Sequence, residues 1–157
     1  MTVSSARQVA ERFAVAAVDP TSPELWDLYG PSVVMEMPFA PPGAPRRDQT
    51  SRAELAARFS KAGPARFEEA RDVIIHDTSD PEVVILECSL RGRIDATGET
   101  FDLPFIMVMT VRDGHIVHSR DYSDPIVGAR ITGTLPQLVD ALAGSPPHQA
   151  GQASRRS

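Results

Sequence analysis

The chain has 157 residues, a formal net charge of −5 at pH 7 and one cysteine. This length suits one domain with a single core, and the acidic balance argues against a nucleic-acid partner, which requires clustered Lys and Arg. Cys88 has no second cysteine to pair with, and no apolar run approaches the roughly 20 residues of a membrane span. We therefore expect a soluble cytoplasmic protein with no membrane or nucleic-acid partner.

Helix signals dominate the first third of the chain. Apolar residues from Val9 to Ala17 recur at helical spacing and predict an amphipathic helix over residues 4–18. Ser22 followed by Pro23 predicts the start of a second, short helix, which Gly30-Pro31 ends. Ser51 and Glu54 form a capping-box motif, which predicts a third helix.

Strand signals dominate the remainder. Residues 33–39 predict a first strand, residues 40–49 a loop, and residues 67–77, 83–94, 101–112 and 115–123 four longer strands. Asp113-Gly114 suits the positive φ angles of a tight hairpin turn between the last two strands. Residues 135–142 predict a last short helix. The order of elements predicts an α+β domain over residues 1–144, in which a mostly antiparallel, curled sheet closes over the helices. Residues 145–157 hold too few apolar side chains to fold and predict a disordered tail.

The strand over residues 115–123 carries the most informative pattern. Ser119, Asp121 and Ser123 share one face of it, where a core strand normally presents bulky apolar groups. An acid between small hydroxyl residues indicates a cavity beside the apolar face of the 101–112 strand. The opposite alternation remains open, with Arg120 and Tyr122 inside and Asp121 in solvent.

The segments VVMEMPFAPPG and DGHIVHSRDYSDP, in this order of elements, resemble the SnoaL-like and limonene epoxide hydrolase branch of the nuclear transport factor-like cone superfamily. The resemblance covers about residues 5–142. It implies a strongly curved sheet that forms a cone around the N-terminal helices, with an internal pocket for a small hydrophobic molecule. It also implies a homodimer through the outer sheet face, where Ile106 and Val108 are too apolar for open solvent.

The resemblance also assigns chemistry to individual positions. Asp121 matches the carboxylate on the last strand that activates water in the epoxide hydrolases. The Arg and second Asp of that mechanism fall on Cys88 and Leu90, so its electrophilic half is missing. The three functional positions of the ketosteroid isomerase branch fall on about Met37, Phe13 and Ile106. What remains resembles the SnoaL cyclases, where one carboxylate serves as acid and base.

We therefore predict Asp121 as the principal catalytic group, with a pKa raised by burial. Glu36 is the predicted assistant, with the alternative that it lies on the solvated side of its strand. The predicted pocket consists of Trp26, Tyr29, Met35, Met37, Phe59, Leu86, Cys88, Leu90, Leu103, Phe105, Met107, Ser119 and Ser123.

Two functions follow as hypotheses. The first is a cofactor-free acid–base enzyme, a cyclase, isomerase or epoxide hydrolase-like protein, acting on a small hydrophobic and polyketide-derived or epoxide-derived molecule. The alternative is a non-catalytic binding or assembly protein of the same fold. The four histidines lack metal-ligand spacing, so we predict no metal site.

Overall fold

A six-stranded mixed sheet organises the fold, in the strand order β2-β1-β6-β5-β4-β3. The computed structural model describes residues 3–59 and 63–144. The strands are β1 (Tyr29–Glu36), β2 (Arg47–Ser51), β3 (Ala65–Asp77), β4 (Val83–Ile94), β5 (Thr100–Arg112) and β6 (His115–Ser123). Neighbouring strands run antiparallel, except for the parallel pair β1 and β6.

The sheet curves strongly but stays open, because β2 and β3 are edge strands. The prediction that the sheet closes is therefore wrong. The predicted α+β class and the mostly antiparallel strand order are confirmed. Part of the curvature comes from β3, whose register with β4 shifts between Phe67 and Glu69 and again between Arg71 and Ile74. Such bulges bend a strand and increase its twist.

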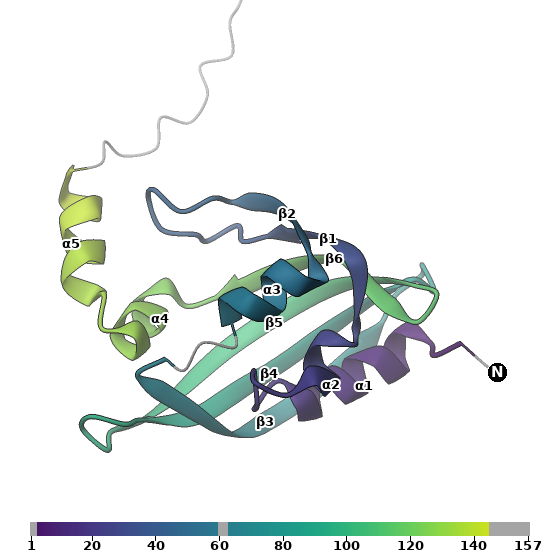
Figure 1. The fold of residues 1–157 in the computed structure, drawn as a ribbon, viewed down its shortest axis with the longest axis horizontal. Coiled ribbons are helices and arrows are strands. Elements are labelled where there is room, and N and C mark those ends of the chain that lie inside the picture. The colour runs from purple at the N-terminus through teal and green to yellow at the C-terminus, as the bar shows by residue number, and fades with distance from the viewer. Residues whose placement is uncertain (1–2, 60–62, 145–157) are drawn as a thin grey trace, which may run out of the picture.

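Three helices lie against one face of the sheet and two lie at its end (Figure 1). The first group is α1 (Ala6–Ala16), α2 (Pro23–Trp26) and α3 (Arg52–Phe59), and the second is α4 (Pro125–Thr132) and α5 (Leu135–Gly144). Helix α1 packs on β3, β4 and β5, and α3 packs on β1. The core lies between these helices and the sheet. No described helix is both long enough and apolar enough to cross a membrane.

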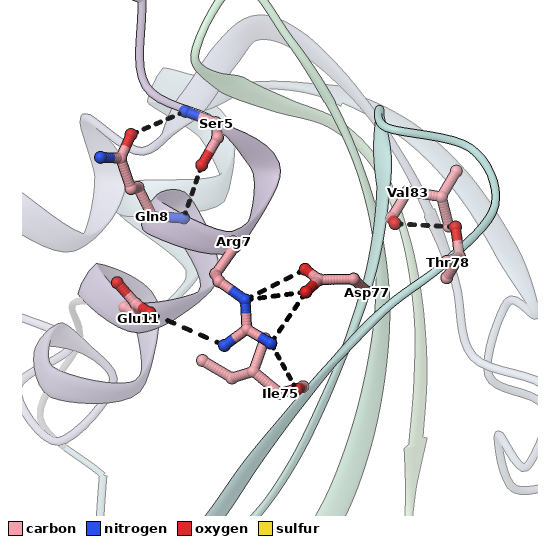
Figure 2. A network of polar contacts seen from close by, with 8 residues as sticks. All are labelled: Ser5, Arg7, Gln8, Glu11, Ile75, Asp77, Thr78 and Val83. Carbon is pink, nitrogen blue, oxygen red and sulfur yellow. Dashed lines mark hydrogen bonds and ion pairs between the residues drawn. The ribbon is translucent and has the colours of Figure 1, made fainter.

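Side-chain caps fix where the helices begin, as the sequence predicts for α2 and α3. Ser51 Oγ accepts a hydrogen bond from Glu54 N, and Glu54 Oε2 accepts one from Ser51 N, which completes the predicted capping box. Ser5 and Gln8 form the same reciprocal pair at the start of α1 (Figure 2).

The start of α1 is also tied to the end of β3. Arg7 Nη2 lies 3.0 Å from Asp77 Oδ2 and donates a hydrogen bond to the carbonyl oxygen of Ile75 at 3.0 Å (Figure 2). The Arg7 fork therefore holds α1 across the edge of the sheet. Phe13, in the last turns of the same helix, is buried in the core.

Two elements were not predicted from the sequence. Strand β2 lies within the predicted loop and its end, and helix α4 follows β6 directly. The sequence of β2, RDQTS, has little strand propensity and is extended because it pairs with β1. The sequence of α4, PIVGARIT, contains Gly and β-branched residues, yet Asp124 caps it by accepting hydrogen bonds from the backbone N–H groups of Ile126 and Val127.

Two predicted boundaries are wrong: β1 spans Tyr29–Glu36 and not residues 33–39, and α2 ends at Trp26, so that Gly30 and Pro31 lie in β1 and do not end the helix. The other boundaries agree to within two residues. Strands β4 and β6 have the predicted bounds, and α1 is shorter than predicted at both ends. Asp113 and Gly114 both have positive φ angles, of 50° and 76°, as the hairpin requires. The predicted tail, residues 145–157, lies outside the described residues.

Candidate functional site

Strand pairing decides which face of β6 points inwards. Asp121 lies opposite Met107 on β5, and Ser119 lies opposite Met109. Residues directly opposite each other on paired strands point to the same side of a sheet. Because Met107 and Met109 are buried in the core, Ser119 and Asp121 face the helices, and Arg120 between them faces outwards.

An inner cavity of about 250 Å³ lies between the helices and the sheet. Its described lining is apolar except for Tyr29, Asp121 and Ser123, and consists of Phe13, Ala17, Pro20, Leu25, Trp26, Tyr29, Met35, Leu55, Phe59, Phe67, Leu90, Leu103, Phe105, Met107, Asp121 and Ser123. One wall is a column of flat rings. Trp26 stacks on Tyr29 with ring centroids 5.9 Å apart, and on Phe59 at 6.0 Å.

An outer cavity of about 550 Å³ adjoins the inner one and shares Phe59, Asp121 and Ser123 with it. The loop after β1 and the helices α4 and α5 form its walls. Its lining is Met37, Phe39, Ala40, Pro41, Pro42, Phe59, Asp121, Ser123, Asp124, Pro125, Gly128, Ala129, Thr132, Thr134, Gln137, Leu138 and Ala141. Asp121 therefore lies at the junction of the two cavities.

Burial gives the Asp121 carboxyl group unusual acid–base properties. Its Oδ1 atom is fully buried and has no hydrogen-bond partner among the described residues, and the same is true of Ser119 Oγ. Loss of solvation disfavours the charged carboxylate and raises the pKa of Asp121 to about 6, while the nearby Ser119 hydroxyl opposes this effect. The side chain keeps partial exposure, which is directed into the cavities that it lines.

Tyr29 is the second ionisable group of the inner cavity. It is only 4% exposed, and burial together with the negative charge of Asp121 raises the pKa of its phenol above the ordinary value of 10. The Tyr29 hydroxyl therefore keeps its proton at neutral pH and can donate it in a hydrogen bond.

The structure does not bring Glu36 and Asp121 together. Met35 lines the inner cavity, so the next residue along β1 points to the opposite face of the sheet. There Glu36 Oε1 lies 2.7 Å from His118 Nε2 and 2.9 Å from Arg47 Nη1. The hydrogen bond with His118 is the main reason that the pKa of Glu36 is lowered. Glu36 lines neither cavity.

Most of the predicted pocket residues line one of the two cavities. Nine of them line the inner one: Trp26, Tyr29, Met35, Phe59, Leu90, Leu103, Phe105, Met107 and Ser123. Met37 lines the outer one. Leu86, Cys88 and Ser119 are buried and line neither cavity. Burial raises the pKa of the Cys88 thiol to about 11.

Sequence reasoning missed two groups of lining residues. Phe13 and Leu55 reach the inner cavity from α1 and α3, and the spacing of apolar residues on these helices could have indicated this. Thr134 and Gln137 reach the outer cavity from the C-terminal end of the chain, where no local signal pointed to a site. Among the described residues, no group of His, Cys, Asp and Glu could hold a metal ion.

Comparison with known proteins gives a family match and two relatives. A family model described as a SnoaL-like domain matches residues 7–119. The uncharacterized protein YesE of Bacillus subtilis is 31% identical over 104 residues, which are 66% of this chain and 69% of YesE. An uncharacterized PhzA/B-like protein of Pseudomonas aeruginosa is 32% identical over 121 residues, which are 76% of this chain and 84% of that protein.

Solved structures show the same fold. A candidate isomerase from Bacillus subtilis matches with a TM-score of 0.71 at 25% identity, over 82% of this chain and 93% of the other. A candidate polyketide cyclase from Pseudomonas putida matches with a TM-score of 0.66 at 17% identity, over 82% and 98%. An LEH-like epoxide hydrolase from M. tuberculosis matches with a TM-score of 0.56 at 22% identity, over 88% and 94%. The last two likenesses concern the fold alone.

Proposed function

The chain belongs to the SnoaL-like domain family, and we propose that it is a cofactor-free acid–base enzyme acting on a small hydrophobic molecule. The observation that carries this proposal is the Asp121 carboxyl group: it lines an apolar cavity, its Oδ1 has no partner among residues 3–59 and 63–144, and burial raises its pKa to about 6. A general base works best when its pKa lies near the working pH, because it is then mostly ionised and still binds a proton well.

The reaction class that fits these residues is proton transfer next to a carbonyl group. The Asp121 carboxylate removes a proton from the carbon beside the carbonyl, and the electron pair of the C–H bond moves towards the carbonyl oxygen. The Tyr29 hydroxyl donates a hydrogen bond to that oxygen as its negative charge develops. Asp121 then returns the proton to the same carbon or to another one. Isomerisation and ring closure of a carbonyl compound can both begin with this step.

Epoxide opening has less support. Among the described residues that line the inner cavity, none is a cation that could hold an epoxide oxygen. The two positions that carry the Arg and second Asp in the resemblance hold Cys88 and Leu90, and both are buried apolar groups here.

The test is hydrogen exchange on a simple ketone. Indanone has a flat ring and an acidic position beside its carbonyl, and its exchange in D₂O is followed by proton NMR. We expect the protein to catalyse exchange and Asp121→Asn to lower the catalysed rate at least about 100-fold, which is typical for loss of a general base. Glu36→Gln is the matched control, since this carboxylate lies on the outer face, and it should keep the rate. Exchange undiminished in Asp121→Asn would favour the non-catalytic binding protein.

A further inference from the structure

The two cavities differ in chemistry although they meet at Asp121. The inner one is walled by the rings of Phe59, Trp26 and Tyr29 and by aliphatic side chains. The outer one adds the polar residues Thr132, Thr134 and Gln137, and the hydroxyl groups of the two threonines are hydrogen-bonded to each other at 2.8 Å. A molecule that occupies both therefore meets an apolar, ring-lined end and a mixed, hydrogen-bonding end.

The two cavities also come from different parts of the chain. Of the residues lining the inner cavity, all but Asp121 and Ser123 lie within the segment that the SnoaL-like family model matches, residues 7–119. The far wall of the outer cavity comes from α4 and α5, which follow that segment. The matched segment thus supplies the ring-lined end and, through the loop after β1, one wall of the outer cavity, whereas α4 and α5 supply the opposite wall.

We propose that the substrate is bipartite: a flat, uncharged ring fills the inner cavity, and an uncharged polar group at the end of a short spacer lies in the outer cavity. This inference rests on the proposed function, because it places the reacting carbon beside Asp121 at the junction. A charged ring is disfavoured because transfer of an unpaired charge from water into an apolar site is costly. Flat rings are favoured because aromatic pairs have geometric preferences that saturated rings cannot satisfy.

Gly128 allows the outer cavity to be filled selectively. It lies on α4, lines the outer cavity, and a Cβ built on it meets no atom within 4 Å. Gly128→Leu should therefore obstruct the outer cavity without disturbing α4. Gly144→Leu is the matched control, since Gly144 ends α5, a Cβ built on it meets no atom of a described residue within 4 Å, and it lines neither cavity. Leu103→Trp fills the inner cavity, and Leu103→Phe replaces it if the larger residue prevents folding.

The measurement is titration calorimetry of the full chain with three probes: ethylbenzene, phenylpentanamide and cyclohexylpentanamide. We expect phenylpentanamide to bind at least about tenfold more tightly than ethylbenzene. It should also bind at least about threefold more tightly than cyclohexylpentanamide. Gly128→Leu should remove the advantage of the amide and leave the ethylbenzene affinity within about twofold, while Gly144→Leu changes neither. A Leu103 variant should weaken both phenyl probes about tenfold.

Three results would overturn the inference: an amide that gains nothing over ethylbenzene, a Gly128→Leu variant that weakens both probes equally, or equal binding of the phenyl and cyclohexyl amides. These results are distinct from a failure of the proposed function. Asp121→Asn preserves the shape of the site, so the probe pattern should persist in that variant. An unchanged exchange rate in Asp121→Asn together with the expected probe pattern would reject the catalytic role alone.

Discussion

The negative charge of Asp121 destabilises the folded protein, because the carboxylate is buried. Its Oδ1 lies in the apolar wall and has no hydrogen-bond partner in the described part of the chain, and burial raises its pKa from 3.8 to about 6. A carboxyl group whose pKa is raised by folding binds its proton more tightly in the folded state. The resulting loss of stability is absent below about pH 3.8, the pKa of Asp121 in the unfolded chain. It is complete above about pH 6, the pKa of Asp121 in the folded protein.

Asp121→Asn should therefore stabilise the protein at pH 8. The rise in pKa corresponds to at most about 3 kcal/mol, and the partial exposure of Asp121 to the cavities reduces this value. Urea unfolding at pH 8 and at pH 3.5 measures the effect, and the gain should shrink towards zero at the lower pH. A gain of equal size at both pH values would show that the charge is not its cause.

Tyr29→Phe tests the hydrogen-bond donor separately from the base. The phenyl ring keeps the stacking on Trp26, with its centroid separation of 5.9 Å, and removes only the hydroxyl group. We expect the exchange rate of indanone to fall about 100-fold, as when one donor to a developing oxyanion is lost. The rate should still follow deprotonation of Asp121 near pH 6. An unchanged rate would remove Tyr29 from the mechanism.

The sequence could not orient single side chains on mixed strands. On β6 both faces combine polar and apolar residues, so alternation left Asp121 open between the cavity and solvent. The pairing of Asp121 with Met107 on β5 places Asp121 on the inner face. On β1 the alternation is equally mixed, and the structure turns Met35 inwards and Glu36 towards His118. Alternation within one strand does not say which of its faces points inwards. Strand register decides this, and register depends on contacts between residues distant in sequence.

Elements with strong local signals were predictable. The hairpin at Asp113-Gly114 and the capping box at Ser51 depend on residues within a few positions, and both are present. Strand β2 and helix α4 depend on partners elsewhere in the fold, and both were missed. The residues that α4 adds to the outer cavity were missed with it, so the predicted site reached the outer cavity only at Met37 and at the shared residues Phe59, Asp121 and Ser123.

Gly92 on β4 shows how one residue permits close packing within the sheet. A Cβ built on Gly92 lies 2.3 Å from the carbonyl oxygen of Arg66 and 2.5 Å from Cζ of Phe101. Gly92→Ala should therefore destabilise the fold by roughly 1–3 kcal/mol, the usual cost of overpacking. Gly128→Ala is the control, because it lies on a helix in open space and should stabilise by about 0.5–1 kcal/mol. Thermal unfolding measures both, and equal stability in the two variants would contradict the crowding at Gly92.

At the scale of the whole molecule, the outer sheet face carries exposed apolar groups. Ile74, Glu87, Ile106 and Tyr122 form one row across β3, β4, β5 and β6 on this face. Ile74 is 51% exposed and Ile106 is 40% exposed, and a groove of about 650 Å³ follows the row. Burial of such apolar surface favours association.

We propose a homodimer through this outer face. Light scattering at micromolar concentration should give twice the mass of the chain, and Ile106→Arg should give a monomer because a charge replaces an apolar contact. Val139→Arg is the control, since Val139 is also exposed, at 54%, but lies on α5, which contributes no residue to the groove. A monomeric wild-type protein, or equal dissociation in both variants, would contradict this interface.

The most direct test of the catalytic claim is an NMR titration of the Asp121 carboxyl carbon in the ligand-free protein, with Asp121→Asn identifying its signal. The structure places this group in an apolar cavity, and burial should give a midpoint at about pH 6. A midpoint near the ordinary value of 3.8 would show that water solvates the carboxylate fully. The proposed general base would then lack the property on which its assignment depends.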